Sequence, residues 1–222
     1  MKNKKIILTV ITTLLIFNLT GCASLLYRLS SQTSNGDSLM MEGIEAYNDG
    51  NYAEAIKNLE QAEEKGLDKQ EISVLHSYLG MCYSDMGMTE MAIEYQEKAL
   101  EEDPSDVQNY VGLAISYRLL GDYDKAMDYY MQGMEVDPDD PELNSSIGTL
   151  YIILDEPQTA IPFFEKALEE NPDLAVTYGN AALAYAMTGD FKTAEEYLQI
   201  SREKGYPNAD IIQQRIDELK IL

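Results

Sequence analysis

The sequence is poor in the residues that build catalytic and metal sites. It contains one histidine, His76, and two cysteines, Cys22 and Cys82, among 222 residues. A zinc site or a Cys–His catalytic pair needs several such side chains close together, and no glycine-rich phosphate loop is present. We therefore expect no enzyme activity, no cofactor and no metal ion. His76 and Cys82 are interpreted as packing residues.

Positive charge is also scarce. The chain has 16 Lys and Arg against 39 Asp and Glu, a formal net charge of −23. Such a surface repels phosphate backbones, so we expect no binding to nucleic acid. The acidic excess has two interpretations, a solvated surface that keeps the protein soluble or an attraction for a basic partner. The acidic run at 137–142 lacks the glycine and the ligand spacing of an EF-hand loop, and we interpret it as a turn.

Long hydrophobic runs are absent except near the amino terminus. Residues 6–19 form an apolar run of 14 residues that is interrupted only by threonines and one asparagine, and Lys2, Lys4 and Lys5 precede it. A membrane-spanning helix needs about 20 apolar residues. A positive start followed by a shorter apolar run is typical of a signal peptide.

The apolar run ends in a short motif with its own chemistry. Residues 19–22 read Leu-Thr-Gly-Cys, which resembles the bacterial lipobox. The resemblance implies that 1–21 are removed, that Cys22 carries a diacylglycerol, and that 22–35 form a lipidated tether. Ala23 after the cysteine implies the outer membrane in a host with two membranes, and the outer face of the membrane in a host with one. The alternative is an uncleaved short anchor in which Cys22 has no lipid.

A 34-residue period dominates the rest of the chain. The strongest marks of this period are four tyrosines, Tyr83, Tyr117, Tyr151 and Tyr185. Alanines follow the same spacing at Ala92, Ala126, Ala160 and Ala194. A fixed period of this length indicates stacked helix–turn–helix units, in which each unit buries its apolar face against its neighbours.

Several positions repeat together within each period. The second unit, for example, carries Leu79-Gly80, Tyr83, Ala92 and Pro104 in order. This pattern resembles the tetratricopeptide repeat (TPR), which implies an all-α, right-handed superhelical solenoid. About five units are expected over 36–208, at 36–69, 73–106, 107–140, 141–174 and 175–208, with 70–72 as an insertion. Residues 209–222 form an amphipathic stretch that we interpret as a capping helix, with a partner-binding helix as the alternative.

The repeated positions have physical reasons. The small residue at the eighth position of each unit lets the second helix of the unit approach the first closely. The glycine at the fifteenth position can adopt the left-handed conformation that ends a helix, and Asp155 occupies that position in the fourth unit. The closing proline ends the second helix, because the residue before a proline avoids helical angles.

The resemblance also implies a concave surface lined by positions 2, 5, 9 and 12 of each first helix and bordered by position 13. Many of these positions are apolar, which suits an amphipathic helix or an apolar peptide. Such a strip could instead be covered by the tether, by the last helix or by a second copy in a homodimer. The candidate groove residues are Met40, Ile44, Tyr47, Met81, Val111, Ile115, Arg118, Ile152, Leu183 and Met187.

These observations predict a lipid-anchored scaffold outside the cytoplasm that binds a protein or peptide partner in its groove. The resemblance to TPR lipoproteins suggests a role in the assembly of the envelope or of a surface machine. The alternative is a lipoprotein receptor that binds a peptide or a solute for a transporter.

Overall fold

The structure is a computed structural model that describes residues 35–221, apart from the side chain of Lys69, and these residues form helices without strands. The chain divides into two compact units, one ending at Asp68 and the other beginning at Lys69. Each unit is described by itself. The first contains one helix pair, α2 (Asn35–Asn48) and α3 (Tyr52–Lys65).

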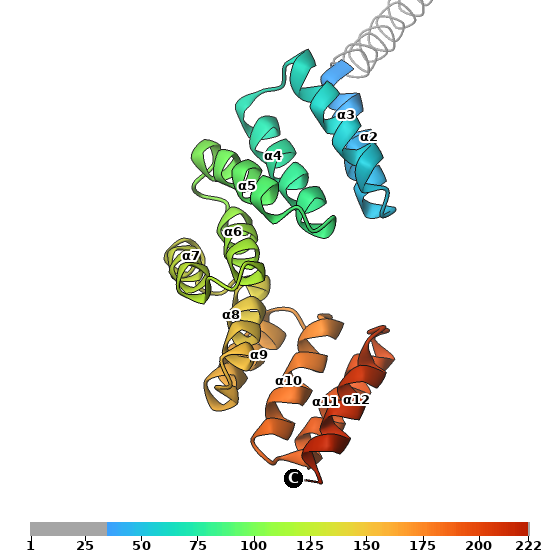
Figure 1. Cartoon of the computed structure of the whole chain (residues 1–222), viewed down its shortest axis with the longest axis vertical. Helices are drawn as coiled ribbons and strands as arrows, with labels where there is room; N and C mark the ends of the chain where they lie inside the picture. Colours follow the sequence, from blue (N-terminus) through green and yellow to red (C-terminus); the bar gives the residue numbers. More distant parts are fainter. Residues whose placement is uncertain (1–34, 222) are drawn as a thin grey trace, which may run out of the picture. The chain divides into compact units, whose positions relative to one another are not determined.

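The second unit contains four helix pairs and a final helix (Figure 1). The first helices of its pairs are α4 (Lys69–Asp85), α6 (Val107–Leu119), α8 (Pro141–Ile153) and α10 (Ala175–Met187). The second helices are α5 (Thr89–Glu102), α7 (Tyr123–Val136), α9 (Pro157–Glu170) and α11 (Phe191–Glu203). The final helix is α12 (Ala209–Leu219). The first helices of successive pairs contact one another, which places them side by side.

Short polar residues set the ends of these helices. Asp140 caps the start of α8, where its carboxylate accepts a hydrogen bond of 2.7 Å from the backbone N–H of Leu143, and Asp106 caps α6 in the same way. Such caps satisfy backbone donors that have no partner within the helix. Helix α7 ends at Val136, just before Asp137-Pro138, as the sequence predicts. The run at 137–142 is therefore the junction between α7 and α8.

The turn within each pair depends on a left-handed residue. Gly87, Gly121 and Gly189 have φ values of 73°, 77° and 87°, which confirms the prediction for the fifteenth position. Asp155 holds that position in the fourth repeat with φ of 60°, the one described non-glycine residue with a positive φ. Glycine adopts this conformation without strain, whereas a residue with a Cβ does so at a cost.

Close approach between the two helices of a pair is equally visible. A Cβ atom added to Gly148 in α8 would lie 2.7 Å from the ring of Phe164 in α9. Phe164 is fully buried and cannot move aside. Gly80 meets Gln96 in the same manner, at 2.6 Å. The small eighth residue is therefore required by the packing, as the sequence predicts.

Paired aromatic rings also join the two helices of each pair. The tyrosine that marks the 34-residue period contacts an aromatic ring 12 residues later, on the second helix. The ring centroids lie 5.2–5.6 Å apart in Tyr83–Tyr95, Tyr117–Tyr129, Tyr151–Phe163 and Tyr185–Tyr197. The first three pairs are stacked and the fourth is tilted. Such contacts add to the stability that burial alone provides.

The two ends of the second unit differ from its middle. At its start, α4 begins at Lys69, so residues 70–72 lengthen the first helix of that pair. At its end, α12 packs against α10 and α11, and Ile212 and Ile216 are buried with Leu198. Helix α12 thus covers the apolar surface that a further repeat would cover. Between residues 35 and 221, no helix has the length and apolar character that crossing a membrane requires.

Candidate functional site: an uncharged face on the first helices

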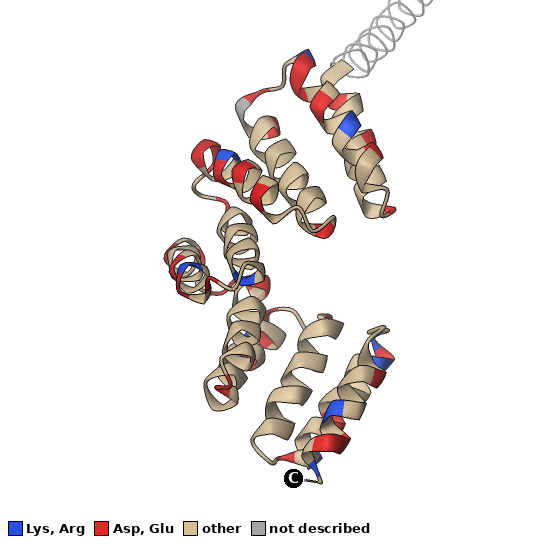
Figure 2. Ribbon diagram, viewed as in Figure 1, with Lys and Arg blue, Asp and Glu red and all other residues tan. Residues whose placement is uncertain are grey.

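Charge is distributed very unevenly between the helices of residues 107–203. Helices α6, α8 and α10 contain two charged residues in total, Arg118 and Glu142. Helices α7, α9 and α11 contain four, four and five. Figure 2 shows this difference as tan first helices beside second helices marked in red and blue. We call the surface of α6, α8 and α10 around Ile115, Ser145 and Val176 the first-helix face.

A hollow of about 210 Å³ lies on the first-helix face. Helix α6 contributes Val111 and Ile115, and helices α8 and α10 contribute residues at their amino-terminal ends. Val111 is 4% exposed and belongs to the floor of the hollow, whereas Val176 is 52% exposed. The remaining lining residues are Glu142, Ser145, Ser146, Leu174 and Thr177. The hollow therefore combines an apolar surface with one carboxylate.

Hydrogen bonds between successive repeats hold the three helices of this face together. Each bond joins two side chains from neighbouring first helices or their caps. The pairs are Gln108–Asp140 at 3.1 Å, Ser145–Thr177 at 2.8 Å and Thr149–Asn180 at 3.1 Å. A hydrogen bond of this kind contributes roughly 1 kcal/mol when both partners are satisfied. The face is thus a preformed surface between repeats.

Glu142 is the one carboxylate among the side chains that line this hollow. It lies in the first turn of α8. Partial burial raises the pKa of its carboxyl, and the negative charge of the neighbouring Asp140 raises it further. Within residues 35–221, no hydrogen bond or salt bridge to the Glu142 side chain is formed. Burial and the charge of Asp140 both disfavour the charged form of Glu142, so a cation placed beside this carboxylate would be stabilising.

The predicted groove residues of the second unit do not all lie in this hollow. Only Val111 and Ile115 line it. Met81 on α4 is 37% exposed, and the other four, Arg118, Ile152, Leu183 and Met187, are half-buried. Ile115 packs against the core between α6 and α8, Ile152 against the core around Phe164, and Leu183 against the core beneath α12. These side chains therefore contribute to the core as well as to the surface.

Arg118 is the single positive charge on α6, α8 and α10. It lies close to the hydroxyl of Tyr130, whose ring is fully buried. Burial raises the pKa of Tyr130, and the nearby Arg118 and Ser146 oppose this effect. Arg118 is therefore placed where it interacts with a buried tyrosine.

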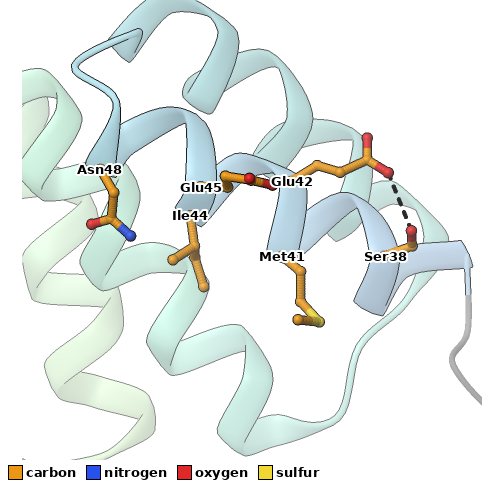
Figure 3. Close-up of a pocket in the computed structure, with 6 residues that line it drawn as sticks. All are labelled: Ser38, Met41, Glu42, Ile44, Glu45 and Asn48. Atoms are coloured by element: carbon orange, nitrogen blue, oxygen red, sulfur yellow. Dashed lines mark hydrogen bonds between the residues drawn. The ribbon is translucent and has the colours of Figure 1, made fainter.

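Met40, Ile44 and Tyr47 belong to α2 in the first unit. All three are half-buried. A hollow of about 550 Å³ lies along this helix, lined by Ile44 together with Ser38, Met41, Glu42, Glu45 and Asn48 (Figure 3). Met41 is 69% exposed. The two glutamates beside these apolar side chains give the first unit a surface that is more acidic than the first-helix face.

The histidine and the described cysteine are packing residues. His76 is 5% exposed, tilts against the ring of Tyr95, and has its Nδ1 3.9 Å from a carboxylate oxygen of Glu102. Cys82 is fully buried, and burial together with the charge of Asp85 raises the pKa of its thiol to about 11. No group of three potential metal ligands occurs in the part of the chain that the structure describes. Cys22, the predicted lipidation site, lies outside the described residues.

The candidate groove residues did not include six residues that line the hollow, Glu142, Ser145, Ser146, Leu174, Val176 and Thr177. Glu142 and Val176 both occupy the second position of their repeats, which the TPR resemblance assigns to the concave surface. Their shared position was a usable signal. The hollow itself depends on how three helices pack, so the 34-residue spacing alone could not locate it.

Comparison with known protein families gives several matches in the repeat region. Three family models, each described as Tetratricopeptide repeat, match this chain. They cover residues 71–139, 141–174 and 163–196. The photosystem I assembly protein Ycf3 of Synechococcus sp. (strain CC9605) is 37% identical over 79 residues, which is 34% of this chain and 44% of that protein. Ycf3 of strain CC9311 is 33% identical over 79 residues, with the same coverage. The chain thus spans less than half the length of these relatives.

Solved structures with the same fold cover more of the chain. TTC0263, a thermophilic TPR protein of Thermus thermophilus, has a TM-score of 0.70 at 19% identity and covers 84% of this chain and 100% of its own. A chain of the APC/C hetero-tetramer Cut9–Hcn1 has a TM-score of 0.77 at 18% identity and covers 88% and 38%. MamA has a TM-score of 0.55 at 21% identity and covers 80% and 95%. At these identities, the likeness shows a shared fold.

Proposed function

Because the chain belongs to the tetratricopeptide repeat family, we propose that it is a scaffold that binds a segment of another protein on its first-helix face. The observation that carries this proposal is the nearly uncharged surface of α6, α8 and α10, which includes a hollow and the exposed Val176, on a chain with a net charge of −23. Apolar surface left clear of charge in an acidic protein is typical of an interaction site.

We further propose that the scaffold is anchored to a membrane by lipid on Cys22, on the side away from the cytoplasm. Three features of the sequence support this. Lysines precede an apolar run at 6–19, the run is too short to span a bilayer, and the lipobox-like motif follows it directly. Two or three acyl chains would give stable attachment, whereas one alone is marginal. In a host with two membranes, Ala23 favours the outer membrane.

The proposed work of the scaffold is assembly of an envelope or surface complex. The curated relatives carry the name photosystem I assembly protein, and their similarity falls within the repeats. That name supports an assembly role for this chain and does not specify its partner. A second copy of the chain is also a candidate partner.

Site-specific photo-cross-linking in the native cells tests the first-helix face as the binding surface. A photoreactive amino acid replaces Val176 on the first-helix face, or Met131 on the second helix α7, in the full-length lipoprotein. The two side chains have nearly equal exposure, 52% and 55%. We expect one defined protein adduct from position 176 and none from position 131, with identification by mass spectrometry.

The outcomes separate the candidate functions. Equal adducts at both positions, or none at either, would contradict the proposed face. A small-molecule adduct at position 176 would support the receptor function instead. An adduct of twice the mass of the chain, with no other protein, would identify the partner as a second copy.

The anchor needs a separate measurement. Metabolic labelling with a traceable fatty acid should mark the wild-type protein and leave the Cys22→Ser variant unmarked, because the thiol that accepts the lipid is gone. Equal labelling of both proteins, or of neither, would show that lipid on this residue is not the anchor.

A further inference from the structure

The hollow on the first-helix face has the size of a single side chain. Its volume is about 210 Å³, whereas pockets for drug-sized molecules range over roughly 300–1,000 Å³. Its apolar lining comes from Val111, Ile115, Leu174 and Val176. An aliphatic side chain of a bound segment would bury apolar surface there, which favours binding.

Most polar groups of this hollow already have partners within the protein. The hydroxyls of Ser145 and Thr177 bond to each other at 2.8 Å. The carboxylate of Asp140, just outside, accepts from the backbone N–H of Leu143 at 2.7 Å and from Gln108 Nε2 at 3.1 Å. The Glu142 carboxylate remains available to a ligand. It is also the one acidic side chain on α6, α8 and α10.

The charge around Glu142 favours a cation over an anion. No lysine or arginine lines the hollow. Asp140 adds a second negative charge near Glu142 and raises its pKa. The first turn of α10 favours an anion instead, because Leu174 provides no side-chain cap and helix amino termini attract anions. The carboxylates of Glu142 and Asp140 together outweigh the roughly half positive charge at each of the amino termini of α8 and α10. The net charge of −23 adds a long-range attraction for basic segments.

We infer that this hollow accepts a protein segment in which an aliphatic side chain stands next to a lysine or arginine. The aliphatic side chain fills the hollow between α6 and α10, and the cation pairs with Glu142 at its edge. This inference rests on the proposed function, because it specifies the chemistry of the segment that the first-helix face binds.

Selection of peptides from a random phage-displayed 12-mer library, panned against the full-length protein in detergent micelles, tests this inference. Four variants accompany the wild type. Glu142→Gln and Val176→Ser alter the hollow, whereas Glu135→Gln and Val136→Ser make the same changes on the exposed end of α7. The two glutamine variants have equal net charge, so any difference between them reports position.

The wild type should enrich peptides that carry Leu, Ile, Val or Met beside Lys or Arg. The Glu142→Gln variant should lose the basic preference and Val176→Ser the aliphatic one, while both α7 variants should behave as the wild type. For a selected peptide, fluorescence anisotropy should show an affinity about fivefold weaker with Glu142→Gln, as for the loss of an exposed ion pair. Added salt should weaken wild-type binding more than binding to Glu142→Gln, because it screens this pair.

Other results would overturn the inference in different ways. Peptides that depend on Val176 but carry no basic residue, or that carry Asp or Glu, would overturn the stated chemistry while the first-helix face remains a binding surface. Peptides that bind equally to all five proteins, or no enriched peptides, would overturn the inference together with the proposed function. Circular dichroism of each variant confirms that its helices are retained.

Discussion

The two helices of each repeat carry very different surfaces. In residues 107–203 the first helices, α6, α8 and α10, hold two charged residues in total, whereas the second helices, α7, α9 and α11, hold four, four and five. Both sets of helices contribute to the same buried cores. The first helices also have more buried residues, six, five and six against three, five and three, so burial accounts for part of the distribution of charge. Charge is concentrated on one set of helices and largely absent from the other.

A division of tasks explains this pattern. Charged second helices keep an acidic repeat protein dissolved, since net charge far from zero opposes association. First helices with little charge can bind an apolar partner while removing few ions from water, a step that costs several kcal/mol per ion. The four predictions below test this division, beginning with the largest effect.

The buried side of the first helices should be chemically inert. In a Cys22→Ser protein, Cys82 is the only thiol, and its pKa of about 11 leaves it almost entirely protonated at pH 8. Because the thiolate is the reactive form, we expect a thiol reagent to react about 100-fold more slowly with the folded protein than with the unfolded protein in urea. Equal rates would show that α4 opens readily or that Cys82 is accessible.

The contact between the two kinds of helix should be intolerant of one added methyl group. Gly148→Ala places a Cβ 2.7 Å from the buried ring of Phe164. We expect a loss of about 2 kcal/mol in the free energy of unfolding, measured with urea, which is within the usual range for an overpacked core. The double variant Gly148→Ala/Phe164→Leu has the residues of the fifth repeat, Ala182 and Leu198. It should recover part of the loss, and no recovery would contradict this origin of the effect.

The two faces should respond differently to the same introduced charge. Ile115→Lys brings a cation to a half-buried position against the core of α6 and α8, and we expect it to lower the free energy of unfolding by about 2 kcal/mol. Met131→Lys on α7 alters a side chain that is 55% exposed, so its effect should stay within about 0.5 kcal/mol. Similar losses in both variants would show that the two faces are equivalent.

The turn between the two helices of the fourth repeat should allow a substitution that stabilises the protein. Asp155 holds φ of 60° where three other repeats of the second unit use glycine. Asp155→Gly should raise the free energy of unfolding by up to about 1 kcal/mol, because glycine adopts this conformation without strain. The reverse change, Gly121→Asp, should lower it by a similar amount. If both variants matched the wild type in urea denaturation, strain at this position would be negligible.

The fold was predictable because each repeat carries the same residues for the same reasons. Small residues such as Gly148 mark the close helix contact, and left-handed glycines such as Gly121 mark the turn. The aromatic partners on the second helices also follow the 34-residue spacing, but their contacts were not predicted from the sequence. They are Tyr95, Tyr129, Phe163 and Tyr197. They precede the buried residues Gln96, Tyr130, Phe164 and Leu198, which differ from repeat to repeat, and the repeat resemblance places its aromatic residue at this later position.

The site was predictable only in outline. The repeat resemblance indicated which positions of a first helix face outward, and Val111 and Ile115 do line the hollow. It did not indicate that Ile152 and Leu183 also pack against the core. Nor did it single out Glu142, whose significance comes from the lack of other acidic residues on three separate helices. Such a lack becomes meaningful only when the structure places these helices side by side.

The ring pairs between helices have a practical consequence. The chain has no tryptophan and 16 tyrosines, and each helix pair of the second unit contains at least one ring pair. Near-ultraviolet circular dichroism reports aromatic rings held in fixed packing, so these ring pairs contribute to the signal of the folded protein. The signal is a sum over the repeats, and replacing the paired tyrosines of one repeat at a time would show how much each repeat contributes without an added label.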